Sequence, residues 1–200
     1  MGFKNYPSLM KLCGFALIMM LLLSACGDHD YSPKPRGFFR IDFPAKAYQS
    51  YNGGCPFTFD YPTYAKVEID SMRGSKPCWL NVQFPQFNGT LHLSYEDVTS
   101  KKMFNELVED AYQFASKHAI KASSIDGVPM AYPERKVYGM YYTIDGNTAS
   151  NAQFFLTDTT RHYLRAALYF RAEPRLDSIQ PVLTFIKKDM DVMIKTLRWK

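Results

Sequence analysis

The apolar and polar residues of the segment 57–95 alternate, and a period of two residues predicts β-structure. The alternation occurs in four separate runs, at residues 57–59, 65–69, 79–84 and 90–95. Residues that interrupt strands lie between the runs, namely Pro62, Arg73-Gly74-Ser75 and the segment 85–89. Because such residues favour turns, this part of the chain is predicted to contain four short strands.

Residues 101–118 have a different spacing, since their apolar side chains recur every three or four positions. This spacing is typical of an amphipathic helix. The residues of the apolar face are Phe104, Leu107, Val108, Ala111, Ala115 and His118. Thr99 or Ser100 can cap the first turn by accepting a hydrogen bond from a free backbone amide. We expect this helix to pack on a sheet.

Three further strands are predicted downstream, at residues 136–144, 150–157 and 161–171. Asp145-Gly146-Asn147 separates the first two, and Gly and Asn tolerate the positive φ that tight turns require. Asp158-Thr159-Thr160 separates the second from the third. The pattern therefore predicts a three-stranded antiparallel meander.

The segment 178–197 is predicted to form the last helix. Its apolar stripe consists of Ile179, Val182, Leu183, Ile186, Met190, Met193, Ile194 and Leu197. Asp177 or Ser178 is the expected cap, which places Pro181 in the first turn, where a missing N–H costs least. Core packing is the expected role of the stripe, and a partner-binding face is the alternative.

These elements predict a single α+β domain over residues 37–200. Its sheet is expected to be mainly antiparallel, because hairpins dominate, with about six or seven strands and two main helices packed on it. The chain has 200 residues, of which 46% are apolar. That is sufficient for one domain with a hydrophobic core.

The first 25 residues have the organisation of a lipoprotein signal peptide. A start that carries only positive charge precedes a short apolar run, and Leu23-Ser24-Ala25-Cys26 follows. A large apolar residue, two small residues and a cysteine form a lipobox, so we expect cleavage before Cys26 and lipid on its sulfur. An uncleaved membrane helix is the alternative. Residues 26–36 are polar, contain two prolines, and are predicted to be a tether.

Charge gives little indication of a nucleic-acid partner. Removal of Lys4 and Lys11 with the signal peptide would lower the formal net charge from +5 to +3. The basic residues otherwise cluster only in pairs, such as Lys101-Lys102. A nucleic-acid-binding surface requires a larger basic patch, so we expect none.

Cysteine use predicts a disulfide. Cys13 lies in the signal peptide and Cys26 is the lipid site, which leaves Cys55 and Cys78. Export implies an oxidising compartment, where two remaining thiols normally pair. A metal-binding pair and a redox centre are the alternatives, although no CxxC motif is present.

No motif predicts an enzyme. The sequence contains no GxSxG, no phosphate-binding glycine loop and no HExxH. Convergence of His92, His118 and His162 with an acid such as Asp158 would create a metal or acid–base site. Without that convergence we expect no catalytic residue, no metal and no cofactor.

Aromatic residues and turns of the meander form a candidate interaction surface, because exposed aromatic patches mark contact sites and turns on a rigid sheet often carry function. The candidate residues are Tyr138, Tyr142, Asn147, Phe155, Asp158 and His162.

The chain resembles the gliding motility lipoprotein GldD family of the Bacteroidetes. The resemblance covers nearly the whole length and rests on several stretches in order. They are the lipobox at Cys26, PKPRGFFRIDFP at 33–44, CPFTF at 55–59, CWLNVQFP at 78–85, KVYGMYY at 136–142, GNTASNAQFFLTD at 146–158, and the final TLRWK.

The resemblance implies an envelope-anchored lipoprotein with a role in gliding motility, whose machinery shares parts with the type nine secretion system. Two hypotheses follow. The first is a non-enzymatic accessory lipoprotein, held by lipid on Cys26, that contacts other gliding and secretion proteins of the envelope. We expect it in the outer membrane, facing the periplasm. The second is a small-ligand-binding protein or hydrolase with a histidine-containing pocket.

Overall fold

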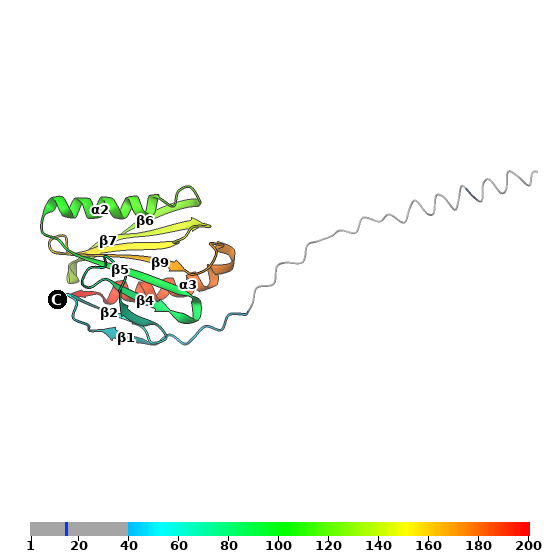
Figure 1. The fold of residues 1–200 in the computed structure, drawn as a ribbon, viewed down its shortest axis with the longest axis horizontal. Helices are drawn as coiled ribbons and strands as arrows, with labels where there is room; N and C mark the ends of the chain where they lie inside the picture. Colours follow the sequence, from blue (N-terminus) through cyan, green and yellow to red (C-terminus); the bar gives the residue numbers. More distant parts are fainter. Residues whose placement is uncertain (1–14, 16–39) are drawn as a thin grey trace, which may run out of the picture. The chain divides into compact units, whose positions relative to one another are not determined.

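Seven strands form the main sheet of the structure, a computed structural model that describes Phe15 and residues 40–200 (Figure 1). Every neighbouring pair is antiparallel. In spatial order the strands are β3 (Lys66–Ile69), β4 (Leu80–Phe84), β5 (Gly89–Asp97), β9 (His162–Phe170), β8 (Ala152–Thr157), β7 (Val137–Gly146) and β6 (Ala122–Tyr132). Short 3₁₀ helices precede β5 and β7, η1 (Pro85–Phe87) and η2 (Pro133–Arg135).

A second sheet has three strands, β1 (Tyr48–Tyr51), β2 (Phe57–Pro62) and β10 (Arg198–Trp199), with β2 in the centre. The alternation of residues 57–59 predicted a strand, and β2 is that strand. It belongs to the small sheet and not to the main sheet. Phe57 and Phe59 are fully buried between the two sheets' side chains. The seventh strand of the main sheet is β6, which the sequence pattern did not predict.

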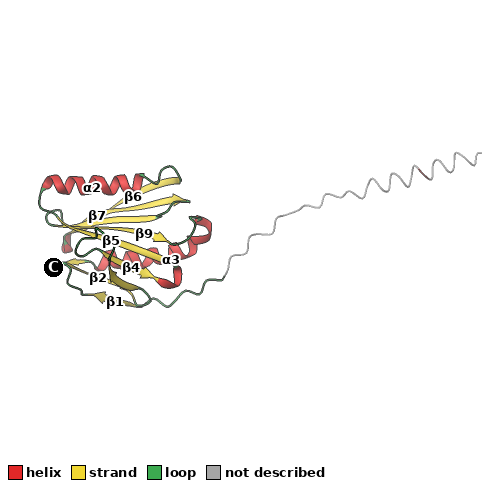
Figure 2. Ribbon diagram, in the orientation of Figure 1, coloured by secondary structure: helices red, strands yellow, loops and turns green. Residues whose placement is uncertain are grey.

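Two helices cover opposite faces of the main sheet in the described part of the chain (Figures 1 and 2). Helix α2 (Lys101–Ser116) packs on one face with Phe155 and Tyr163. Helix α3 (Leu176–Thr196) packs on the other face, together with the small sheet, against Phe154 and Leu156. All six residues of β8 are buried because both of its faces are covered. The predicted α+β fold with a mainly antiparallel sheet is confirmed.

Strand β6 is an edge strand, and its sequence explains why it was missed. It contains Gly127 and Pro129, which are unfavourable within most strands. An edge strand tolerates proline because one row of its backbone N–H groups has no partner strand. Most of its side chains are exposed, so no clear alternation marks it.

Helix α3 begins earlier than predicted. Its first residue is Leu176, and the residue before it, Arg175, makes no side-chain capping bond. Pro181 is therefore the sixth residue of the helix and lies beyond the first turn, which corrects the sequence prediction. The apolar stripe packs as expected, with Leu183, Ile186 and Met190 fully buried.

The signal peptide, Cys26 and the tether at 26–36 lie outside the described residues, and these assignments stay predictions. Residues Arg40–Lys200 form one compact unit. In the portion of the chain that the structure describes, no helix is long and apolar enough to cross a membrane.

Candidate functional site

A cleft of about 370 Å³ lies between α2 and the main sheet. Its lining residues come from α2, from β5 and β9, and from the segment just before β4. Its apolar lining consists of Trp79, Met103, Leu107, Phe114 and Tyr163. Its polar lining consists of Lys76, Ser94, Glu96, Asp110 and Arg165. Clefts that combine apolar walls with a few polar groups are the usual form of a binding site.

Two hydrogen bonds define α2 beside the cleft, a cap within the helix and a bond to the main sheet. The Oγ of Ser100 accepts a hydrogen bond of 3.1 Å from the amide of Met103, as the predicted cap. The hydroxyl of Tyr163 donates a hydrogen bond of 2.8 Å to the carbonyl of Leu107. The hydrogen bond from Tyr163 ties α2, which forms one wall of the cleft, to β9 of the main sheet.

The floor of the cleft is set by the sheet register. Arg165 pairs with Ser94 of β5 on one side and with Phe155 of β8 on the other. Directly paired residues have side chains on the same face. The small Ser94 therefore lies beside Arg165, with Phe155 on the far side of the arginine, and both Ser94 and Arg165 line the cleft.

Arg165 is the cation at the centre of this floor. It donates a hydrogen bond of 2.7 Å to Oε1 of Gln153, and its guanidinium lies 4.4 Å from the ring centroid of Phe114. No carboxylate of the described residues lies within 4.0 Å of it. Burial lowers the Arg165 pKa, and the hydroxyls of Tyr169 and Tyr163, followed by the carboxylate of Asp110, partly oppose this effect. The guanidinium nevertheless stays charged, as arginine does in proteins.

The other charged side chains of the cleft, unlike Arg165, are either paired with an opposite charge or exposed to water. Lys76 and Glu96 form an ion pair of 2.8 Å, in which Lys76 is mostly exposed and Glu96 mostly covered. Asp110 is exposed on α2. Gln153 is only 2% exposed, and its Nε2 has no hydrogen-bond partner in the described structure. The floor therefore holds an arginine without an ion pair, and the buried amide of Gln153 beside it does not line the cleft.

The six residues of the candidate interaction surface do not lie on one exposed face. Tyr142 and Phe155 are buried under α2, with exposed fractions of 8% and 6%. Tyr138 is half-buried on β7. Asn147 is exposed, and its Oδ1 accepts a hydrogen bond of 2.8 Å from the amide of Leu176, the first residue of α3. The expectation of an exposed aromatic patch is therefore corrected, because α2 covers that part of the sheet.

Asp158 and His162 shape the hairpin between β8 and β9. Oδ1 of Asp158 accepts hydrogen bonds from the amides of Thr160, Arg161 and His162, at 3.0, 2.8 and 2.8 Å. Burial opposes ionisation of Asp158, but these amides outweigh it and lower its pKa to about 2. His162 is buried, with Nδ1 2.8 Å from the Tyr95 hydroxyl. Both side chains organise the turn and its surroundings.

The three histidines do not converge. His92 pairs with Ala167 and His162 pairs with Asp97 on the same two strands. The odd separation from His92 to Asp97 places the two imidazoles on opposite faces, roughly 16 Å apart along the strand. His118 lies in the turn after α2. Among the described residues, no group of three or more His, Cys, Asp or Glu side chains could hold a metal ion.

A cluster around Asp189 was not predicted from the sequence. Asp189 of α3 is 2% exposed and accepts hydrogen bonds from Lys46 Nζ at 2.6 and 2.7 Å. The hydroxyls of Tyr48 and Tyr64 donate to the same carboxylate, that of Tyr48 at 2.9 Å. Burial and the carboxylate raise the pKa of Tyr48 to about 12. The cluster fastens residues 46–48 to α3, which is a structural role.

Cys55 and Cys78 face each other just before β2 and β4, with their Cα atoms 5.5 Å apart. This separation is within the range of disulfides. A bond at this position would link the small sheet to the main sheet. The geometry agrees with the predicted pairing of Cys55 with Cys78.

We expect the double substitution Cys55→Ala, Cys78→Ala to lower the free energy of unfolding by about 3 kcal/mol, because it removes a cross-link that restricts the unfolded chain. Urea unfolding followed by circular dichroism measures the difference. Alkylation of the native protein without reductant, followed by mass spectrometry, is the control. Modification of both thiols in that control would contradict the disulfide.

Comparisons with known proteins give one family. The model described as gliding motility lipoprotein GldD matches residues 28–199. No curated protein matches the chain significantly. Among solved structures, the solution structure of cyanobacterial PsbP (CyanoP) from Synechocystis sp. PCC 6803 is similar, with a TM-score of 0.47 and 12% identity. That alignment covers 78% of this chain and 95% of the other.

Proposed function

Because the chain belongs to the gliding motility lipoprotein GldD family, we propose that it supports the type nine secretion machinery associated with gliding, through contacts with other envelope proteins. The observation that carries this proposal is the family match over residues 28–199, which begins two positions after Cys26. Membership implies an accessory lipoprotein of gliding motility in the cell envelope. The contribution to secretion is the proposed part.

The anchor in this proposal is lipid on Cys26. Several acyl chains on one residue hold a protein stably at a membrane, whereas one chain gives only marginal binding. We further propose that the membrane is the outer membrane and that residues Arg40–Lys200 face the periplasm. An oxidising periplasm would suit the pairing of Cys55 with Cys78.

The described fold offers a binding surface and no assembled catalytic group. The cleft beside α2 combines apolar walls with an arginine that has no counter-ion. The three histidines of the alternative hypothesis do not share one face, since His92 and His162 lie on opposite faces of the sheet. This arrangement favours a contact function over a histidine-dependent hydrolase.

Deletion of the gene is expected to abolish colony spreading and to lower the amount of surface adhesin that reaches the medium or the cell surface. Spreading on soft agar and quantitative proteomics of the secreted fraction measure the two effects. Complementation with the wild-type gene is the control. A deletion strain that does not spread but secretes normally would contradict the secretion part of the proposal. A deletion strain that still spreads would contradict the motility role as well.

A further inference from the structure

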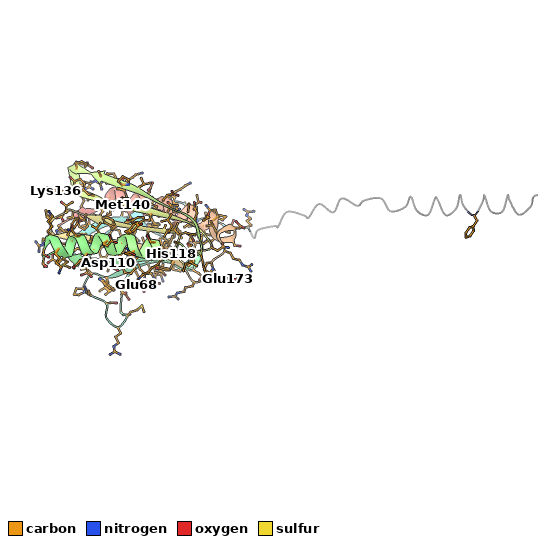
Figure 3. All side chains as sticks on the ribbon, turned by 90° about the horizontal axis from the view of Figure 1, so that it is seen from above. Glu68, Asp110, His118, Lys136, Met140 and Glu173 are labelled. Atoms are coloured by element: carbon orange, nitrogen blue, oxygen red, sulfur yellow. A yellow bond between two sulfur atoms is a disulfide. The ribbon has the colours of Figure 1, made fainter. Side chains whose placement is uncertain are left out.

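We propose that the cleft between α2 and the main sheet binds an extended, acidic segment of a partner polypeptide, with one carboxylate on Arg165. The choice of a polypeptide rests on the proposed contact function. The choice of a carboxylate rests on the cleft itself. Figure 3 labels Asp110 on α2, His118 in the turn that follows it, and Glu68 on β3.

The first argument is the charge state of Arg165. Moving a cation out of water is costly unless an anion or a set of hydrogen-bond acceptors compensates. The described residues supply neutral oxygens, those of Gln153 and Tyr169, and the ring face of Phe114, but no carboxylate within ion-pair distance. Guanidinium has five N–H donors in a fixed fork that matches a carboxylate in two parallel bonds. A bound carboxylate would supply the missing partner.

The second argument is the position of the guanidinium. Arg165 lines the cleft, whereas Gln153, whose Oε1 accepts a hydrogen bond from it, does not. The buried amide therefore holds the guanidinium from behind, and the remaining N–H donors are available to a group in the cleft.

The third argument concerns the competing acids. Glu96 is already paired with Lys76 at 2.8 Å, and Asp110 is exposed on the rim of the cleft. Neither occupies the guanidinium. A segment that lays a carboxylate on Arg165 would place a neighbouring apolar side chain against Trp79, Met103 and Leu107, which form the apolar wall.

The test uses the protein as cells produce it, purified in detergent, and ¹⁵N NMR of its two tryptophan indoles. Trp79 lines the cleft, whereas Trp199 stacks on His162 at a ring distance of 5.1 Å. The chain has two Trp residues, so Trp199 is an internal reference. The probes are acetylated tripeptide amides with a central Glu flanked by Phe, Leu or Met, and the same peptides with Gln in place of Glu.

We expect the Glu peptides to shift the Trp79 signal saturably and leave the Trp199 signal in place. The Gln peptides should bind at least about ten-fold more weakly, as expected for loss of a hydrogen bond to a charged group. Equal affinity of the two peptide sets, absence of a saturable Trp79 shift, or equal shifts of both indoles would overturn the proposal.

The informative variant is Ser94→Glu. Ser94 pairs directly with Arg165 on the same face of the sheet, so the new carboxylate lies beside the guanidinium and competes for it. Affinity for the Glu peptides should fall at least about ten-fold, and an unchanged affinity would overturn the proposal. Asn105→Glu adds an equal charge at an exposed position of α2 and should leave affinity unchanged.

Arg165→Gln is a second variant, and the unchanged Trp199 signal reports whether it is folded. It should remove the preference for Glu over Gln peptides, and a preserved preference would overturn the proposal. Failure here is distinct from failure of the proposed function. The deletion strain tests motility without any peptide, and the titration tests the cleft without any cell.

Discussion

Replacement of Asp189 by alanine is expected to lower the free energy of unfolding by about 3 kcal/mol, among the largest effects of any single change in the domain. Asp189 is buried and accepts from Lys46, Tyr48 and Tyr64. Removing one partner of a buried ion pair leaves an uncompensated charge and unsatisfied donors, which typically costs 3–5 kcal/mol. The lower end is expected because the Lys46 side chain is 27% exposed and can regain some water.

Urea unfolding monitored by circular dichroism measures this loss. Asp191→Ala is the matched control, since Asp191 lies on the same helix and makes an exposed ion pair with Lys195 at 3.4 Å. Exposed pairs contribute about 0–1 kcal/mol, so the control should differ little from the wild type. Equal destabilisation by the two substitutions would show that the buried cluster contributes no more than a surface pair.

The double variant Lys46→Met, Asp189→Leu separates the charge from the packing. If the cost of Asp189→Ala comes from the abandoned charge and donors, removal of both charges should recover part of the stability, as apolar replacements of buried pairs often do. The hydroxyls of Tyr48 and Tyr64 still lose their acceptor, so recovery should be partial.

The second large effect is expected from Cys26→Ala, which should move the protein from the membrane fraction to the soluble fraction. The substitution removes the sulfur that accepts lipid, and no helix of the described residues can replace the anchor. Fractionation and labelling with a palmitate analogue measure the change.

Cys13→Ala is the control for Cys26→Ala. It changes a cysteine in the segment expected to be cleaved off, so lipid labelling and membrane association should be unchanged. A Cys26→Ala protein that stays in the membrane fraction and still carries label would contradict the assignment of the lipid site.

The sequence predicted the local elements that a single chain segment can specify. Alternation marked β4 and β5, whose inward residues such as Val82 and Leu91 are fully buried. The spacing of apolar residues marked α2 and α3, and Ser100, the cap of α2, was one of the two residues predicted for that role. Local periodicity is sufficient for these elements because burial on one face repeats with the period of the backbone.

Strand partners and edges were not predictable in the same way. Residues 57–59 alternate like the other strands, but β2 pairs with β1, the strand directly before it, and with β10, which is far away in the sequence. Strand β6 carries Gly127 and Pro129 and is a strand only because β7 pairs along it. Likewise, the burial of Tyr142 and Phe155 depends on α2 lying over them.

The functional sites also differ in whether contiguous residues or tertiary contacts define them. The lipobox at Cys26 and the family resemblance are properties of contiguous residues, and the sequence alone was enough to recognise them. The strand HYLRAALYF did contain a signal, a lone arginine in an apolar run, but only the tertiary structure placed α2 beside Arg165 and opened the cleft there. The contact between Lys46 and Asp189 joins residues 143 positions apart. Such contacts are fixed by chain packing, and no local period encodes them.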